Sequence, residues 1–292
     1  MLLFCNHWVY SYITFHRLCK LLSWYLLLVC CGANAEVLQV AISNPQNLNA
    51  SDPRYYFEKL LFLALAKTRE TDGPFVIRHN YHGNGTERDR AMLIAGSGID
   101  VMWGTVTRER KNTVRVVSAN ILKDLNNYHI LLINSHDQAT FDKIHSLDEL
   151  RKLTAGSGLH WTDTKILKAN GFNVMTTPNY LGLYKMLEAH RVDFISRGLH
   201  EIGYDFVNFE KDGLVIENNF ILKYDLLAKY SFFVKKDNAK LAMRIERGLR
   251  LAEADGSYDA LFNSMSSFKR GMDILASPQR IVIELNNKID QN

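Results

Sequence analysis

The stretch GSGIDVMWGTVTRER, residues 96–110, joins a short apolar run to a polar end. The apolar part, residues 99–103, is typical of a buried strand, and Thr105 and Thr107 follow it closely. Arg110 stands three positions beyond Thr107. Hydroxyl groups and a guanidinium at a strand end can hold an anion, because the planar guanidinium offers a carboxylate two parallel hydrogen bonds. The stretch therefore predicts one half of a clamp for a small anionic or zwitterionic molecule.

Strand-like and helix-like segments alternate around this stretch. Residues 37–43 (VLQVAIS) form a predicted strand, and residues 55–67 follow with apolar side chains at the spacing of one helix face. A predicted helix over 88–95 leads into the strand at 99–103. This strand, helix, strand order is typical of an α/β fold with a mainly parallel sheet flanked by helices.

A second series of elements begins after the apolar pattern breaks at 122–127. Residues 128–133 (YHILLI) start it, and the block is long enough to form a domain of its own. Three helices and a strand continue it, over 147–153, 162–169, 180–189 and 192–195. Beyond the block, a strand at 228–236 precedes an amphipathic helix at 238–254, and SPQRIVIEL at 277–285 is expected to add an edge strand.

The composition is that of an ordinary globular protein, since 47% of the 292 residues are hydrophobic and 23% are charged. A formal net charge of +4 gives no general electrostatic footprint for nucleic acid. P-loop and dinucleotide fingerprints are absent. The GSG sequences at 96–98 and 156–158 lack the spacing of a nucleophile elbow and are predicted to be turns. His79, His82 and Glu87 are interpreted as a polar loop, because metal ligation needs convergent geometry. We therefore expect no enzyme, no cofactor, no metal and no nucleic-acid partner.

The first 35 residues have the pattern of a secretory signal peptide. Arg17 and Lys20 precede an apolar run at 21–31, and a small-x-small site ends at Ala35. We predict cleavage after Ala35 and an exported mature chain. The apolar run is shorter than the roughly 20 residues that span a bilayer, although an uncleaved anchor, a lipid anchor at a cysteine and a start site further downstream remain alternatives. All four cysteines lie in this segment, so the mature chain has no thiol for disulfides, metal sites or catalysis.

Three blocks of the sequence resemble the family 3 extracellular solute-binding proteins, in the family's order. They are residues 96–110, HRVDFI at 190–195 and LRLAEADGSYDALF at 249–262. The resemblance covers essentially residues 36–265 and implies the type II periplasmic binding fold. In this Venus-flytrap fold each of two lobes is a mainly parallel sheet flanked by helices, and the chain crosses between the lobes twice at a hinge.

The two crossings predict the lobes of this chain. We expect lobe one to comprise residues 36–123 and 223–292, and lobe two to comprise residues 124–222. The ligand would then lie in the cleft between the two lobes.

The resemblance also implies ligand contacts in lobe one. In similar proteins the arginine of a T-x-x-R pattern holds the α-carboxylate of the ligand, which maps onto Thr107 and Arg110, with Thr105 as a neighbouring contact. A surface salt bridge is the alternative role for Arg110. Trp103 maps to a position that faces the ligand, where it would form a stacking wall, although a tryptophan at a strand end also suits a core.

In lobe two, GSGLHWTDTKILKANGF at 156–172 resembles the family segment in which a small-residue turn opens a helix. A helix N-terminus presents unpaired N–H groups and a favourable dipole to an anion, and Thr162 is the expected cap. His160 and Trp161 occupy positions that are small in the family. His160 and Trp161 are therefore predicted either to contact the ligand or to serve local packing.

The stretch VDFISRGLHEI at 192–202 departs from the family pattern. Amino-acid binders usually place an acid a few positions after the VD pair, where it neutralises the ligand's ammonium. Here the neighbourhood contains Arg197, and the nearest acid is Glu201. Arg197 either meets a second negative group of the ligand or pairs with Glu201. Both are predicted site residues. The missing acid argues against a standard α-amino acid and leaves a dicarboxylate-like, peptide-like or modified amino-acid ligand as the alternative.

These features predict a monomeric periplasmic protein that captures an amino acid or a related small carboxylate. The partner implied by the resemblance is the permease of an ABC importer. One alternative is a binding protein that signals to a sensor kinase. Another is an enzyme on the same fold, similar to a cyclohexadienyl dehydratase, in which Glu201 would act as a general acid for the loss of water and carbon dioxide.

Overall fold

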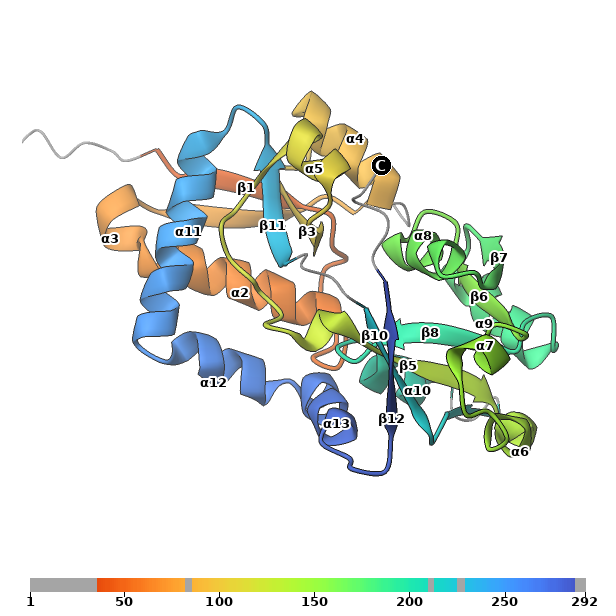
Figure 1. Ribbon diagram of the computed structural model, residues 1–292. Helices are drawn as coiled ribbons and strands as arrows, with labels where there is room; N and C mark the ends of the chain where they lie inside the picture. The colour runs from red at the N-terminus through yellow and green to blue at the C-terminus, as the bar shows by residue number, and fades with distance from the viewer. Residues whose placement is uncertain (1–35, 82–85, 210–212, 225–228, 287–292) are drawn as a thin grey trace, which may run out of the picture. The chain divides into compact units, whose positions relative to one another are not determined.

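The computed structural model describes residues 36–81, 86–209, 213–224 and 229–286 (Figure 1). The predicted signal peptide and all four cysteines lie outside the described residues. Leu38–Asn292 form one compact unit. None of the helices in the described ranges is long and apolar enough to cross a membrane.

Two small sheets contain the strands on either side of the stretch at 96–110. β1 (Leu38–Ile42) pairs in parallel with β2 (Phe75–His79). In the second of these sheets, β11 (Tyr230–Lys235) lies between β3 (Val101–Thr105) and β4 (Val114–Val116) and runs antiparallel to both. The predicted strands at 37–43, 99–103 and 228–236 are therefore confirmed within one or two residues. β11, which lies far along the chain, holds β3 in place.

The larger sheet in the described part of the chain has seven strands, in the order β12-β10-β5-β8-β6-β7, with β9 paired to β5 outside this path. Its strands are β5 (Tyr128–Asn134), β6 (Thr154–Gly158), β7 (Asn173–Thr177), β8 (Phe194–Gly198), β9 (Leu214–Ile216), β10 (Phe220–Tyr224) and β12 (Ile281–Leu285). β6 is parallel to β7 and β8, and β10 is parallel to β12, whereas β5 is antiparallel to its neighbours. The α/β class is confirmed. The seven-stranded sheet is mixed because β5 runs against its neighbours, and the β3-β11-β4 sheet is antiparallel because β11 runs against both of its neighbours.

Two details of this sheet differ from expectation. The sequence at 156–158 is not a turn: it lies in β6, where small residues leave room for neighbouring side chains. The GSG sequence at 96–98 is a turn, with φ of +68° at Gly96 and +83° at Gly98. The edge strand expected at 277–285 is confirmed as β12, which pairs with β10 in the large sheet rather than with a strand of the small sheets. The division into lobes at 123 and 223 stays a prediction.

The helices follow the predicted faces. α2 (Pro53–Lys67) begins after Asp52, whose side chain accepts a hydrogen bond from the Arg54 N–H, and it buries one apolar face. α11 (Ala239–Ala254) lies beside α2 (Figure 1). The remaining helices are α3 (Arg69–Asp72), α4 (Thr86–Ala95), α5 (Arg108–Thr113), α6 (Gln138–Phe141), α7 (Leu147–Leu150), α8 (Thr162–Ala169), α9 (Tyr180–Glu188), α10 (Ile202–Phe209), α12 (Ser257–Ser264) and α13 (Ser266–Leu275), with short 3-10 turns η1 (Leu125–Asn127) and η2 (Ser135–Asp137).

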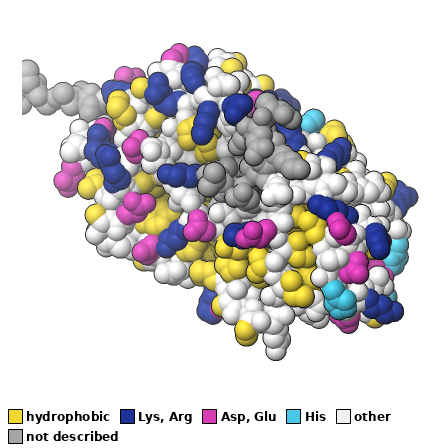
Figure 2. All heavy atoms as spheres, viewed as in Figure 1, with side chains coloured by type: hydrophobic (Ala, Val, Ile, Leu, Met, Phe, Trp, Pro, Cys, Tyr) yellow, Lys and Arg dark blue, Asp and Glu magenta, His cyan; other side chains and the backbone are white. Residues whose placement is uncertain are grey.

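The surface carries charges of both signs. On the face shown in Figure 2, lysine and arginine side chains are interspersed with aspartate and glutamate side chains rather than gathered into one patch. This distribution agrees with the small net charge of +4. A site for an anion must therefore be built locally, from a few side chains.

Candidate functional site

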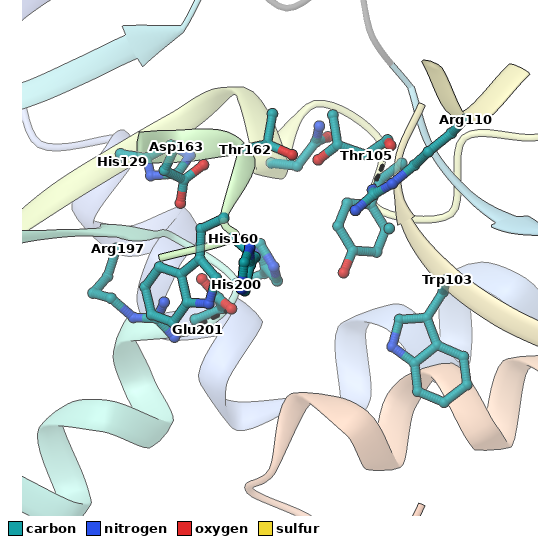
Figure 3. Close-up of a pocket in the computed structure, with 14 residues that line it drawn as sticks. Trp103, Thr105, Arg110, His129, His160, Thr162, Asp163, Arg197, His200 and Glu201 are labelled. Atoms are coloured by element: carbon teal, nitrogen blue, oxygen red, sulfur yellow. Dashed lines mark hydrogen bonds and ion pairs between the residues drawn. The ribbon is translucent and has the colours of Figure 1, made fainter. Parts of the chain in front are cut away.

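A pocket of about 230 Å³ lies where the end of β3 meets the ends of β8 and the start of α8 (Figure 3). We call it the main pocket. Seven of the eight predicted ligand residues line it: Trp103, Thr105, Arg110, Trp161, Thr162, Arg197 and Glu201. Its other lining residues are Gly104, Asn126, His129, His160, Asp163, His200 and Tyr230. The structure therefore brings together residues that are up to about a hundred positions apart in the sequence.

Thr107 is the predicted residue that does not line the main pocket. It lines an adjoining pocket of about 270 Å³, which shares Arg110, His160 and Thr162 with the main pocket. Its side chain caps α5 by accepting a hydrogen bond of 3.2 Å from the backbone N–H of Arg110. The three-residue spacing in the T-x-x-R pattern is thus the spacing of a helix N-cap. Thr107 positions Arg110 and does not face the main pocket itself.

Arg110 points into the main pocket from the side of β3. Its Nη1 donates a hydrogen bond of 2.7 Å to the backbone oxygen of Thr105, which Figure 3 marks with a dashed line. A Cβ atom at position 104 would come within 2.7 Å of the same nitrogen, so Gly104 leaves room for this bond. Burial lowers the pKa of Arg110, and no carboxylate forms an ion pair with it anywhere in the described ranges. A partly buried cation without a counter-ion favours an anionic ligand group.

The aromatic wall beside Arg110 rests on the core. Phe57 of α2 stacks on Trp103 at 5.3 Å between ring centroids and on Tyr230 at 5.2 Å. Both outer rings line the main pocket. Trp103 packs on Phe57 and remains partly exposed at the main pocket, and its role as a wall for the ligand stays a prediction.

Arg197 lies on the opposite side and is already paired. Its Nε donates to Asp205 Oδ2 at 2.5 Å, and its Nη2 lies 3.2 Å from Glu201 Oε1. Only 5% of the Arg197 side chain is exposed, and none of the Asp205 side chain. Burial lowers the pKa of Arg197, but Asp205 and Glu201 outweigh it and bring the value well above the usual range. The ion pair with Glu201 was one of two roles considered for Arg197, and the structure adds a second acid.

Asp205 follows Glu201 by four residues, one turn of helix later. Both carboxylates therefore reach the same guanidinium, and Tyr180 also donates a hydrogen bond to Asp205. Burial raises the pKa of Asp205, while Arg197 opposes the rise. The spacing of Glu201 and Asp205 was visible in the sequence. The sequence did not show that Asp205 would be buried and would become the closer partner of Arg197.

The start of α8 differs by one residue from the expectation. Trp161 occupies the N-cap position without a side-chain cap bond, and Thr162 is the first helical residue. A Cβ atom at Gly158 would overlap the Trp161 ring, so glycine at the end of β6 makes space for the indole. The indole in turn lies over the Arg197 guanidinium at 4.7 Å. Trp161 thus both packs locally and lines the main pocket.

Two histidines in the pocket were not predicted from the sequence. His129 comes from β5 and His200 follows β8. Burial lowers the pKa of His129 to about 4 and that of His200 to about 3, so both imidazoles are neutral near pH 7. His129 stacks on Tyr224 at 3.8 Å, and its Nδ1 lies 3.4 Å from Ser196 Oγ. No local motif marks either histidine, because strand pairing across β5 and β8 brings them to the pocket.

Asp163, the second residue of α8, also went unpredicted. Figure 3 shows its carboxylate beside His129, on the side of the pocket opposite Arg110. Burial raises the pKa of Asp163 to about 7, the charge of Glu201 acts in the same direction, and Arg197 opposes them. The pocket therefore has an acid of its own on the wall that faces the arginine.

Metal binding finds no support in the described ranges, since no group of three or more His, Cys, Asp or Glu side chains there could hold a metal ion. His79 contacts Glu58 through Nε2 at 3.0 Å. His82, the other histidine of that polar stretch, lies outside the described residues.

Comparison with solved structures identifies proteins of similar fold. No protein-family model and no curated protein matches the chain. A periplasmic binding protein of Salmonella typhimurium with high arginine specificity superposes with a TM-score of 0.59 and 14% identity, over 79% of this chain and 99% of the other. A histidine kinase sensor domain with similarity to periplasmic binding proteins superposes with a TM-score of 0.56 and 16% identity, over 80% of this chain and 96% of the other. An ancestral amino-acid-binding protein, a precursor of cyclohexadienyl dehydratase, superposes with a TM-score of 0.51 and 18% identity, over 78% of this chain and 94% of the other.

These likenesses establish the fold of the periplasmic binding proteins for this chain. The three structures are those of a binding protein, a sensor domain and the precursor of an enzyme, and all three share one architecture. Because one fold can carry several activities, function has to be argued from the site.

Proposed function

We propose that this chain is an exported solute-binding protein that captures a small polar molecule bearing a carboxylate, an amino acid or a related compound. The observation that carries the proposal is the contrast between the two arginines of the main pocket. Arg197 is neutralised by Asp205 and Glu201, whereas Arg110 has a single backbone acceptor and no carboxylate partner in the part of the chain that the structure describes. Arg110 is therefore the group that would bind the ligand's carboxylate.

The arrangement of the pocket supports capture by closure. One wall comes from β3 and its neighbours and carries Arg110, and the other comes from β8 and α8 (Figure 3). In our proposal residues 36–123 and 223–292 form one lobe, residues 124–222 form the other, and the two rotate about the hinge crossings. A ligand that contacts both walls stabilises the closed form, because only that form provides all of its contacts.

The location and the partner belong to the same proposal. Residues 1–35 would direct export to the periplasm and be removed after Ala35. The mature monomer would deliver its ligand to the permease of an ABC importer, as the resemblance to family 3 binding proteins implies. A sensor kinase is the alternative partner, since a kinase sensor domain shares the fold.

Ligand capture is preferred over catalysis because of the state of Glu201. This residue is the candidate general acid for a dehydratase-like reaction, and its carboxylate is already held by Arg197 at 3.2 Å. Failure of the purified protein to convert prephenate or arogenate would agree with this preference, and turnover of either would contradict it.

The test of the proposal is the affinity of an Arg110→Ala variant. The predicted mature chain, residues 36–292, is screened by thermal shift against amino acids, dicarboxylates, short peptides and polyamines, since a ligand that binds the folded form raises its melting temperature. We expect Arg110→Ala to weaken binding of any carboxylate hit by about 2 to 5 kcal/mol, because a desolvated anion loses its counter-ion.

The control is Arg250→Ala, which removes an arginine that is 68% exposed on α11. This variant should bind like the wild type. Equal affinity of wild type and Arg110→Ala for the same carboxylate would contradict the proposal, as would a panel in which no carboxylate stabilises the wild-type protein.

A further inference from the structure

Asp163 is a carboxylate that faces the main pocket without a protein partner. It lies at the second position of α8 and is partly buried. Within the described residues its side chain makes no hydrogen bond and no ion pair. By contrast, Glu201 is paired with Arg197, and Asp205 with Arg197 and Tyr180. The Asp163 carboxylate is therefore open to the pocket and available to a positively charged group of a ligand.

Among the residues that the structure describes, the wall around Asp163 has no unused positive charge. The cation Arg197 is shared by Asp205 and Glu201, and Arg110 lies across the pocket beside Thr105. The remaining ionisable groups that line this space or act on Asp163 come from several elements: His129 of β5, His160 before α8, His200 after β8, Tyr224 of β10 and Tyr230 of β11. His129 and His200 are neutral near pH 7, since burial lowers the pKa of each below its usual value. Burial also raises the pKa of both tyrosines, which stay uncharged.

A second group with unused hydrogen-bonding capacity lies in the same wall. His200 is 6% exposed and lines the pocket beside Glu201, and its Nδ1 has no hydrogen-bond partner among the described residues. The wall opposite Arg110 is thus polar, acidic and incompletely satisfied. The arginine side needs an anion, and the Asp163 side needs a cation.

We infer that Asp163 is the residue that determines ligand class: it selects molecules that carry a cationic ammonium or guanidinium group in addition to the carboxylate held by Arg110. This inference rests on the proposed function and names the substrate class of the same pocket. Arg197 is then part of the acidic wall's support, because it holds Glu201 and Asp205 in place and has no free charge for a second ligand carboxylate. Dicarboxylates without a cation are excluded.

A consequence of this role is that binding displaces a proton. With burial and the charge of Glu201 raising the pKa of Asp163 to about 7, much of the ligand-free protein carries a proton there at slightly acid pH. A ligand cation beside Asp163 favours the ionised carboxylate, which lowers this pKa in the complex. Affinity for a cationic ligand must therefore rise with pH through this range and fall by up to about tenfold per pH unit below it.

The experiment compares three probes by isothermal titration calorimetry at about pH 5.5 and about pH 8, a range that brackets the Asp163 transition. L-Arginine and L-glutamine carry a carboxylate and one or more cations, and glutarate carries two carboxylates and no cation. We expect at least one of the amino acids to bind at least about tenfold more tightly at the higher pH, with release of close to one proton at the lower pH. Glutarate should bind more weakly than that amino acid at both values.

The matched variants are Asp163→Asn and His160→Asn. Asp163→Asn keeps the shape of the side chain and should remove the pH dependence of binding. It should also weaken binding of the amino acid at least about tenfold at the higher pH. His160→Asn should keep the pH dependence, which separates Asp163 from the histidine that precedes α8 and also lines the pocket. A thermal melt of each variant verifies folding.

Two outcomes would overturn the inference. One is Asp163→Asn binding that keeps the wild-type pH dependence, and the other is tighter binding of glutarate than of both amino acids. Loss of binding in Arg110→Ala together with either result would leave the proposed function standing and refute the role of Asp163 alone. Absence of binding by both amino acids to a wild-type protein that binds a carboxylate without a cation would also refute the role of Asp163 alone.

Discussion

The pocket depends on glycines that lack a side chain as well as on the side chains that line it. Gly104 lacks the Cβ atom that would crowd Arg110 Nη1, and Gly158 lacks the one that would overlap Trp161. Thr107 contributes the N-cap of α5, which positions Arg110. The side chains that face the pocket therefore depend on neighbours that do not, because a guanidinium or an indole can be held in one rotamer only where its surroundings fit.

Arg197 gives the sharpest residue-scale prediction, since its cation balances two carboxylates in a buried position. Arg197→Met should lower the free energy of unfolding of the ligand-free protein by about 3 to 5 kcal/mol, because Asp205 would be left as a buried charge without its counter-ion. Urea denaturation measures this loss.

The control is the double variant Arg197→Met, Asp205→Leu. It removes the charge together with its closest counter-ion and should recover a large part of the stability. If Arg197→Met unfolded like the wild type and lost only ligand affinity, Arg197 would be a ligand contact rather than a structural ion pair.

At the scale of elements, the contact between α2 and α11 holds the aromatic wall in place. α2 contributes Phe57, on which Trp103 and Tyr230 stack, and α11 packs along α2 at a glycine. A Cβ atom at Gly248 would overlap the backbone carbonyl of Ala64. The two helix backbones therefore approach each other closely only because residue 248 has no side chain.

This close approach predicts an unusual effect of alanine in a helix. Helix propensity alone would make Gly248→Ala stabilising by about 1 kcal/mol. We expect the reverse, a loss of about 1 to 3 kcal/mol, because the helices must separate to admit the methyl group. Gly182→Ala in α9 is the matched control, since its nearest neighbour would lie 3.3 Å from the new Cβ atom. Chemical denaturation of both variants decides the matter, and a Gly248→Ala protein more stable than the wild type would contradict the packing argument.

At the scale of the whole molecule, buried ionisable groups couple folding to pH. The pKa values of His129 and His200 are lowered to about 4 and about 3 by burial, so the folded protein leaves them neutral where the unfolded chain protonates them near pH 6.5. The unfolded state then binds more protons, and stability falls as the pH falls from about 6.5 toward about 4. Asp163 acts in the opposite sense, since its raised pKa makes the folded state take up a proton first.

Removing one of these histidines should flatten the acid side of the stability profile. His129→Phe keeps a ring against Tyr224, which His129 stacks on at 3.8 Å, and cannot be protonated. We expect the loss of unfolding free energy between about pH 7 and about pH 4.5 to be smaller than in the wild type by up to about 3 kcal/mol. His136→Phe, at an exposed position, should keep the wild-type slope. Identical slopes for His129→Phe and the wild type, measured by urea titration, would refute the assignment.

Much of the architecture followed from the sequence by itself. Period and composition located the strands around 37–43, 99–103 and 128–133 and the helices at 162–169 and 238–254, because each buries one face and its apolar residues must recur at the spacing of that face. The fold was predicted from the three sequence blocks that resemble the family 3 binding proteins. Seven of the eight predicted ligand residues line one pocket.

What the sequence could not supply was the partner of each charged group. From the sequence, Arg197 and Arg110 were both candidates for holding a ligand anion. In the fold, Asp205 and Glu201 pair with Arg197, whereas no carboxylate in the described part of the chain pairs with Arg110. Asp163 looked like a common first-turn acid until burial and the charge of Glu201 raised its pKa. Secondary structure is encoded locally, by periodicity and caps. Burial and charge pairing are decided by segments distant in the chain, so only the tertiary structure assigns these residues their chemistry.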